Sequence, residues 1–302
     1  MMRTDEKMSG IITPMITPLD IDQNIDIVGL EKLLEFLIKG GVSGVFIMGS
    51  SGEGPYLTNK NKEILIRNTV YLCKGRVKVL VGALEASTKQ AIETCRLAEK
   101  YEADAVVITC PYYIVVSQKE IYNHIDEIAH HTTLPVMLYS IPSCTNNSIE
   151  IGTLRDLLVS NPNIIGIKDS AGDFCRFENI LLLKNEFKDF VVFQGAEKLA
   201  DLALMKGADG LVPGLSNVVP HLFKEMYDAI KISDDTALAF SIQEQINRLW
   251  ELHQLGHWLP CLKMATSSVS GVNPYVQSPL SALDDNDRIK IEELLANVCV
   301  CN

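Results

Sequence analysis

Eight short apolar runs recur along the chain, and each is followed by a segment in which apolar residues repeat at helical spacing. Intervals of roughly 20–33 residues between successive runs suit strand–helix units that build a parallel barrel. We therefore predict the α/β class and a (β/α)8 TIM barrel. A doubly wound open sheet is the alternative, but Ile12-Thr13-Pro14-Met15 in the first run is not the glycine fingerprint which that fold would carry. The runs begin near residues 11, 44, 77, 105, 135, 164, 190 and 210.

Capping signals set the expected bounds of the elements. Asp26 is placed to cap the first helix, and Ser87 and Ser117 each precede a Gln or Glu by three residues, which predicts two capping boxes. The expected strands are Gly10–Thr17, Gly44–Met48, Val77–Val81, Ala105–Thr109, Val136–Tyr139, Ile164–Lys168, Phe190–Gln194 and Gly210–Val212. Helices after the first are expected at 60–71, 87–101, 117–131, 151–160, 174–185, 198–206, 218–231, 236–255, 259–270 and 287–298.

The helices expected at 218–231, 236–255, 259–270 and 287–298 lie beyond the eighth strand. No low-complexity linker separates them from that strand. We therefore expect residues 9–231 to form the barrel. Residues 232–302 are expected to form a C-terminal helical region that packs on the barrel and is not an independent domain.

The charge balance restricts the possible partners. The formal net charge is −11 and no cluster of Lys and Arg appears, so we expect no nucleic-acid and no membrane partner. The first ten residues, MMRTDEKMSG, precede no apolar segment of the kind found in secretory signals, and no apolar run is long enough to span a bilayer. These features predict a cytoplasmic protein.

The eight cysteines are scattered, and none belongs to a CxxC pair. We interpret all of them, including Cys299 and Cys301 near the end of the chain, as reduced thiols. Neither a disulfide framework nor a zinc site is expected.

Two residues capable of proton or nucleophile chemistry end neighbouring predicted strands. Tyr139 ends one, Lys168 ends the next, and the helix at 151–160 lies between them. Such a unit joins parallel strands, so both side chains are expected at the same edge of the sheet. A lysine at a strand end is usually solvated, but an amine beside a phenol suggests imine chemistry. A neutral amine attacks a ketone, burial favours that neutral form, and a phenol can carry protons.

Four motifs occur in order at the matching strand ends, and together they resemble the dihydrodipicolinate synthase and N-acetylneuraminate lyase family. The resemblance covers roughly residues 9–297 and implies a pyruvate-dependent class I aldolase that needs no cofactor and no metal. The motifs are Gly49-Ser50-Ser51-Gly52-Glu53, Pro111-Tyr112-Tyr113, Tyr139-x-x-Pro142 and Gly166-Ile167-Lys168-Asp169.

The resemblance also implies roles for individual residues. Lys168 would form the imine with pyruvate, Tyr139 would shuttle protons, and Ser50 would relay protons to Tyr139. Ser51 and its loop would hold the pyruvate carboxylate, and Tyr113 would enter the site of a neighbouring subunit in a homotetramer built as a dimer of dimers. Further substrate-binding candidates at the same edge are Gly49, Cys144, Gly195, Glu197 and Val212.

Departures from the family pattern concern the second substrate, an aldehyde. Cys144 stands where the lysine-pathway synthase carries an arginine for the aldehyde's carboxylate, and a thiol cannot replace that charge. Ser140, Thr145 and Glu197 are expected partners for substrate hydroxyls, although Glu197 equally fits a solvated loop carboxylate. We therefore expect cleavage or formation of a 2-keto-3-deoxy sugar acid. The alternatives are dihydrodipicolinate synthase, N-acetylneuraminate lyase, an imine-dependent dehydratase and a non-catalytic metabolite-binding relative.

Overall fold

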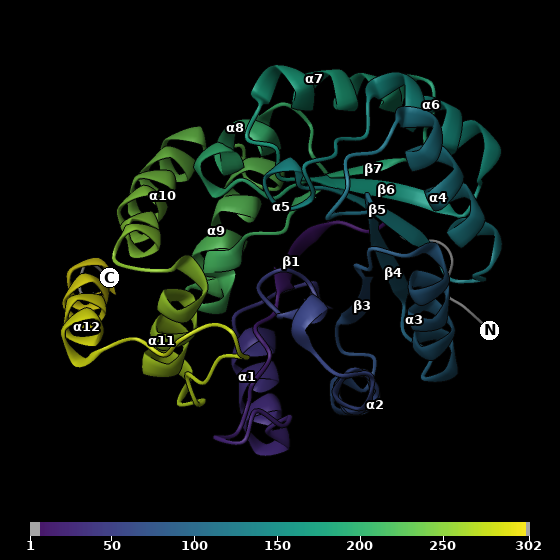
Figure 1. Ribbon diagram of the computed structural model, residues 1–302. Coiled ribbons are helices and arrows are strands. Elements are labelled where there is room, and N and C mark those ends of the chain that lie inside the picture. Colours follow the sequence, from purple (N-terminus) through teal and green to yellow (C-terminus); the bar gives the residue numbers. More distant parts are fainter. Residues whose placement is uncertain (1–6, 300–302) are drawn as a thin grey trace.

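The computed structural model describes residues 7–299, and its eight parallel strands close into a barrel. Each strand pairs with the next in chain order, and β1 pairs with β8 to complete the ring (Figure 1). The predicted TIM barrel is therefore confirmed. The strands are β1 (Gly10–Pro14), β2 (Gly44–Ile47), β3 (Lys78–Ala83), β4 (Ala105–Thr109), β5 (Val136–Ser140), β6 (Ile164–Asp169), β7 (Val191–Gln194) and β8 (Gly210–Leu211).

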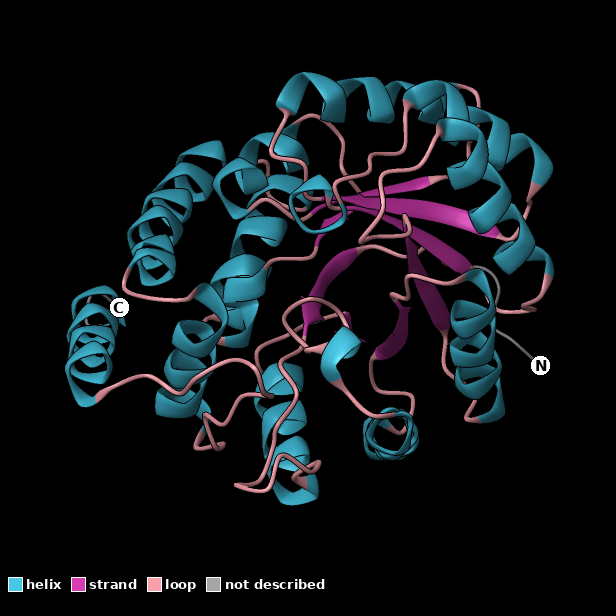
Figure 2. Cartoon of the chain, viewed as in Figure 1, coloured by secondary structure: helices cyan, strands magenta, loops and turns pink. Residues whose placement is uncertain are grey.

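Helices cover the outside of the barrel (Figure 2). They are α1 (Ile27–Lys39), α2 (Asn59–Cys73), α3 (Thr88–Lys100), α4 (Gln118–His130), α5 (Pro142–Thr145), α6 (Ile151–Ser160), α7 (Phe174–Leu182), α8 (Ala200–Met205), α9 (Pro220–Lys231), α10 (Thr236–Leu249), α11 (Trp258–Ser270) and α12 (Asp285–Cys299). After α9, α10 packs against it, and α11 lies beside α1 and the loop after β8 (Figure 1). Within residues 7–299, none of the helices has the length and apolarity that crossing a bilayer requires.

Short 3-10 helices occupy parts of three segments that were predicted as single helices, 174–185, 198–206 and 236–255. Tighter turns are common where helices begin and end, and here one of them places Glu197 in a helical turn directly after β7. The 3-10 helices are η1 (Gly54–Tyr56), η2 (Leu183–Asn185), η3 (Glu197–Leu199), η4 (Gly214–Asn217) and η5 (Trp250–Gln254).

The capping predictions are partly confirmed. Asp26 caps α1, and Ser117 forms the complete capping box of α4, in which Glu120 accepts a hydrogen bond from the Ser117 N–H at 2.7 Å. The box predicted at Ser87 is wrong, because its hydroxyl accepts no bond from the first turn of α3. Ser87 and the glutamine three residues later are exposed, so water can serve the first N–H groups of that helix.

The register of β5 and β6 places the two predicted reactive residues together. Tyr139 is the direct neighbour of Lys168 across the parallel pair, which confirms that both lie at the carboxyl end of the strands. Side chains alternate along each strand, so one set faces the helices and the other fills the barrel. The inner set forms an apolar cluster, here called the inner cluster, which includes Ile12, Phe46, Val107, Tyr139, Phe193 and Val212.

His124 is a histidine of α4 whose burial opposes protonation. Its Nδ1 lies 2.9 Å from Thr88 Oγ1, and desolvation lowers its pKa from 6.5 to about 4. The unfolded chain binds a proton as the pH falls below 6.5, whereas the folded chain binds it only near pH 4, so stability is lost in that window. We expect this group to remove about 3 kcal/mol from the free energy of unfolding between neutral pH and about pH 4.

Denaturant unfolding of the wild type and of His124→Asn, at several pH values across that window, isolates this contribution. The stability difference between the two proteins should move in favour of the variant as the pH falls. A difference that stays constant with pH would show that His124 does not cause the acid sensitivity.

Candidate active site

Lys168 lies one residue before the end of β6, and its side chain enters the inner cluster. The residue is only 4% exposed. Its Nζ lies 4.0 Å from the centre of the Tyr139 ring and 5.3 Å from the centre of the Phe46 ring. The amine is therefore enclosed by aromatic faces at the edge of the barrel where sequence reasoning placed it. Little of the Lys168 side chain is therefore open to solvent.

Gly195 follows β7 and packs directly against this lysine. A Cβ atom at residue 195 would lie 2.8 Å from Lys168 Cε and 2.0 Å from Ser170 Oγ. Both separations are too short for a real contact, so a larger residue here would displace the lysine stem. The predicted candidate Gly195 thus lies at the site, where its lack of a side chain leaves room for Lys168.

Tyr139 is 3% exposed, and its ring is held by contacts that do not use the phenol oxygen. The ring meets that of Phe46 edge to face, with 6.0 Å between centres and planes at 85°. Thr109 Oγ1 donates a hydrogen bond to the Tyr139 carbonyl at 2.9 Å, which anchors the end of β5. Phe46 was missed from the sequence, although strand alternation in β2 was the signal that turns it inward.

The loop after β2 carries the predicted carboxylate-binding residues. Ser51 is buried and Ser50 is partly exposed. Gly54 N–H donates to the Gly49 carbonyl at 3.2 Å, and Thr17 Oγ1 donates to the Gly52 carbonyl at 2.5 Å. The loop is therefore closed on itself and tied to the segment after β1.

The backbone of this loop is strained at two positions that are not glycine. Met48 has φ 59° and Glu53 has φ 56°, both in the left-handed region. Each costs roughly 1–2 kcal/mol and persists only where the surroundings impose it. At Gly54 a Cβ atom would lie 2.0 Å from the Met48 carbonyl oxygen, so the turn also requires glycine there.

Glu53 forms a buried ion pair that the sequence did not predict. Its carboxylate meets the ammonium of Lys263 on α11, and both side chains are 0% exposed. The other carboxylate oxygen accepts a hydrogen bond from the Gln277 N–H at 2.6 Å, and Lys263 also donates to the Tyr275 carbonyl. Desolvation lowers the pKa of Lys263, and the Glu53 carboxylate opposes that shift. A lysine within the apolar run Leu259–Ala265 was the only sequence signal.

Glu197 is buried in η3, so the alternative of a solvated loop carboxylate is wrong. Its Oε1 accepts a hydrogen bond from the Leu215 N–H at 2.6 Å, and its Oε2 lies 3.5 Å from Nε2 of His253 in η5. A Cβ atom at Gly214 would lie 3.3 Å from Glu197 Oε1 and 3.9 Å from Ser51 Oγ. The carboxylate of Glu197 and the hydroxyl of Ser51 therefore flank the same glycine. Val212, just after β8, lies in the inner cluster.

Tyr113 is not brought to Lys168 within this chain. It lies in the loop between β4 and α4 with φ 79°, and 95% of it is exposed. The next two residues, Ile114 and Val115, are also largely exposed. Tyr112, by contrast, is partly buried, and its phenol donates to the Leu84 carbonyl at 3.3 Å.

The residues expected to meet the aldehyde lie in and around α5, and two of them are engaged elsewhere. Cys144 is exposed. Thr145 Oγ1 donates to the carbonyls of Ile141 and Asn147, and the Ser140 hydroxyl faces Arg176. Thr145 thus spends its hydroxyl proton on backbone carbonyls, and Ser140 accepts a bond from Arg176 at 3.4 Å, so neither hydroxyl is free of partners within this chain.

Arg176 is bound to the outer side of the barrel end. Its Nε donates to Asp169 at 3.1 Å and its NH2 group to the Ile149 carbonyl at 2.7 Å. Burial raises the pKa of the Asp169 carboxyl, and the guanidinium opposes this shift. Asp169 follows Lys168 in β6, so the two side chains point to opposite faces of the strand. Arg176 thus anchors the strand end from outside the barrel.

The described cysteines are free thiols, and burial raises the pKa of Cys73, Cys95 and Cys110 to about 12. The predictions for Cys299 and Cys301 lie outside the described side chains. Within the described part of the chain, no group of three or more His, Cys, Asp or Glu side chains is placed to hold a metal ion.

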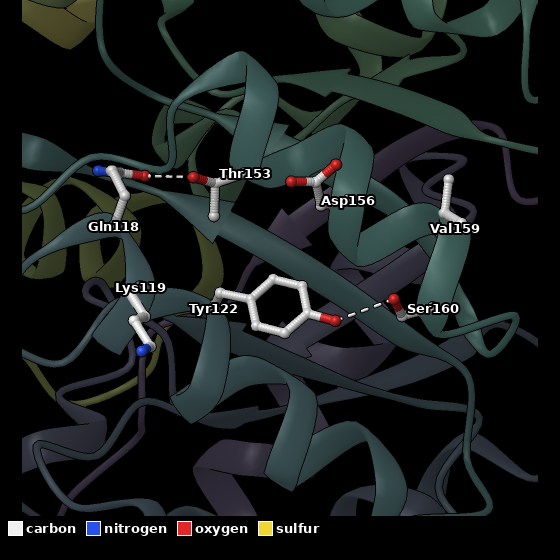
Figure 3. A pocket seen from close by; sticks show the side chains of 7 residues that line it. All are labelled: Gln118, Lys119, Tyr122, Thr153, Asp156, Val159 and Ser160. Atoms are coloured by element: carbon white, nitrogen blue, oxygen red, sulfur yellow. Dashed lines mark hydrogen bonds between the residues drawn. The ribbon is translucent and has the colours of Figure 1, made fainter.

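A groove of about 550 Å³ lies between α4 and α6 (Figure 3). Its polar walls bond to each other: the Tyr122 phenol donates to Ser160 Oγ at 2.9 Å, and Thr153 Oγ1 donates to Gln118 at 2.8 Å. The lining residues belong to α4 and α6, and none comes from a strand end. This groove is therefore on the outer surface and is not the reaction site.

Comparison with known proteins places the chain in a family context. The model of the dihydrodipicolinate synthetase family matches residues 7–298. An uncharacterized DapA-like lyase of Pyrococcus horikoshii is 36% identical over 74% of this chain and 77% of its own length. The 4-hydroxy-tetrahydrodipicolinate synthase of Staphylococcus carnosus is 30% identical over 95% of this chain and 96% of its own. A solved structure of YagE, a prophage protein of the dihydrodipicolinic acid synthase family from E. coli K12 in complex with pyruvate, matches with a TM-score of 0.93, 28% identity, and coverage of 97% and 99%.

Proposed function

Because the chain belongs to the dihydrodipicolinate synthetase family and is a lyase of the class I aldolase type, we propose that it cleaves or forms a 2-keto-3-deoxy sugar acid through an imine on Lys168. The observation that carries this proposal is the buried amine of Lys168 above the Tyr139 ring. This arrangement supplies a nucleophile and a proton carrier at adjoining strand ends, with no added cofactor.

The cleavage follows from the chemistry of these two groups. The neutral amine of Lys168 attacks the C2 ketone, and loss of water gives an imine that becomes electron-withdrawing when protonated. Tyr139 accepts the proton of the C4 hydroxyl as the C3–C4 bond breaks, which releases the aldehyde and leaves an enamine. Protonation at C3 and addition of water then release pyruvate and restore the lysine. Condensation is the same sequence in reverse.

The hydroxyls of the loop after β2 serve the other end of the 2-oxo acid. Ser51 and the loop amides hold its carboxylate, and Ser50 relays protons to Tyr139. The buried setting of Ser51 supports this role, because hydrogen bonds to a carboxylate are stronger where water is excluded. Glu197, on the other side of Gly214, is the candidate for hydroxyls of the sugar acid.

A homo-oligomer completes the proposal. Tyr113 enters the site of a neighbouring subunit, and the assembly is a tetramer built as a dimer of dimers. The exposure of Tyr113, Ile114 and Val115 supports this arrangement, since a run of three large exposed side chains is unusual on a free surface.

A second candidate is 4-hydroxy-tetrahydrodipicolinate synthase, the name of the relative from Staphylococcus carnosus. It uses the same imine with a different aldehyde. The two candidates therefore differ at the aldehyde site, where Cys144 lies.

Trapping the imine tests the shared chemistry. We expect borohydride with pyruvate to give an irreversible mass gain on the whole protein, and peptide mapping to place it on Lys168. Lys263 is the internal control, because it is also buried but already paired with Glu53. A modification on Lys198 or Lys206, or no modification, would contradict the mechanism.

A further inference from the structure

The ion pair between Glu53 and Lys263 joins the loop after β2 to the C-terminal helices. The two residues are far apart in the chain, and both are completely buried. Buried ion pairs contribute little net stability, because desolvation of two charges offsets their attraction, and apolar side chains of similar volume often stabilise a fold equally well. General stability is therefore a weak explanation for this pair.

The position of Glu53 gives the pair a more specific consequence. Glu53 directly follows Ser51 and Gly52, and its own backbone is left-handed at φ 56°. A residue with a side chain keeps this conformation only when contacts impose it. The contacts of the Glu53 carboxylate come from Lys263 and from the Gln277 N–H, both in the C-terminal region.

The backbone of the same loop has other restraints. Thr17 donates to the Gly52 carbonyl, and the Gly54 N–H closes on the Gly49 carbonyl. The first bond ties the loop to the segment after β1, and the second closes the loop on itself. The carboxylate of Glu53 is the point at which α11 and the segment after it act on the loop.

We infer that Lys263 is a positioning residue, whose ion pair with Glu53 holds the loop 49–54 in the conformation that presents Ser50 and Ser51 to the carboxylate of the 2-oxo acid. This inference rests on the proposed function. It makes the C-terminal helical region part of the substrate-binding apparatus, although none of its residues touches the 2-oxo acid in this scheme. Loss of the pair should weaken 2-oxo acid binding more than it impairs imine formation at saturation.

The test uses the double variant Glu53→Gln/Lys263→Met, which leaves no unpaired buried charge. Circular dichroism and the thermal midpoint report folding. The pyruvate concentration that half-saturates borohydride trapping reports binding, and the maximal extent of trapping on Lys168 reports the chemistry. We expect the half-saturating pyruvate concentration to rise at least roughly tenfold, which is the cost of a misaligned hydrogen bond to a charged group. The maximal extent of trapping on Lys168 should be retained.

Two further variants keep the test decisive. Glu53→Asp keeps both charges but shortens the link between the loop and Lys263 by one methylene, and it should raise the half-saturating pyruvate concentration by a smaller factor. Lys184→Met is the matched control, because Lys184 pairs with Asp209 at the opposite, amino-terminal end of β8, and it should stay within twofold of the wild type. If the double variant does not fold, Glu53→Asp, which leaves no buried charge unpaired, decides by the same comparison.

The outcomes separate the inference from the proposed function. One outcome would overturn the positioning role and leave the aldolase proposal intact. In it, the wild type traps pyruvate, and the folded Glu53 and Lys263 variants need a half-saturating pyruvate concentration within twofold of the wild-type value. An equal rise in Lys184→Met would also overturn the positioning role, because the effect would then be one of general stability. Wild-type protein that traps no pyruvate would overturn both.

Discussion

Tyr139→Phe is expected to lower turnover by about 10²–10⁴-fold while leaving the trapped pyruvate adduct on Lys168 in place, because proton transfer is the function of the phenol. The ring contacts with Phe46 and with Lys168 Nζ do not involve the phenol oxygen, so phenylalanine should keep the pocket shape. Steady-state rates of pyruvate release and borohydride trapping, measured on the same preparation, give the two quantities.

Tyr122→Phe is the matched control for this substitution. It removes a phenol that bonds Ser160 in the groove between α4 and α6 (Figure 3), away from the carboxyl ends of the strands, and it should leave turnover unchanged. A loss of less than about tenfold in Tyr139→Phe would mean that a water molecule or Tyr113 carries the proton.

The pairing of Tyr139 with Lys168 could be predicted because it follows from chain topology alone. Two strands joined by one helix run parallel, and their carboxyl ends meet at one edge of the sheet. The register in the structure makes the two residues direct neighbours. The same reasoning placed Gly195 at this edge, but it could not show that the glycine is needed to make room for the lysine stem.

The ion pair of Glu53 with Lys263 could not be predicted, because it depends on how the C-terminal helices dock on the barrel. Sequence spacing carries no information about a contact between segments so far apart. The burial of Glu197 has this origin in part, since one of its partners, His253, belongs to η5 in the C-terminal region. The outward orientation of Ser140 was in principle accessible, because its neighbour Tyr139 faces inward and successive residues of a strand alternate.

The second large effect concerns the aldehyde. We expect glyceraldehyde or another hydroxylated aldehyde to react faster than aspartate semialdehyde, by a factor of roughly ten to more than a hundred. The synthase substrate brings a second carboxylate into the site, and losing a charged hydrogen bond to it costs about 1.5–3 kcal/mol. Cys144 supplies no positive charge in place of that partner.

Arg176 does not replace the missing arginine as a partner for the aldehyde's carboxylate. Arg176 lies close to the end of β6, but its guanidinium is bound to Asp169 and to the Ile149 carbonyl outside the barrel. Ser140 and Thr145 are also engaged, so the preference rests on the absent charge and not on hydroxyl groups from these two residues. If Glu197 meets the substrate as proposed, its carboxylate would strengthen the preference, because it accepts hydrogen bonds from hydroxyls and repels a second carboxylate.

Initial rates with both aldehydes at equal pyruvate concentration measure the preference, and Cys144→Arg provides the matched variant. The side chain of Cys144 is exposed, so an arginine there has room to extend toward the aldehyde. It should raise the rate with aspartate semialdehyde relative to that with glyceraldehyde, since a guanidinium binds a carboxylate through two parallel hydrogen bonds. The sugar-acid assignment would be overturned in favour of the synthase if the wild type condensed aspartate semialdehyde with pyruvate faster than every hydroxyaldehyde tested. That result would require a cation delivered from another loop or subunit.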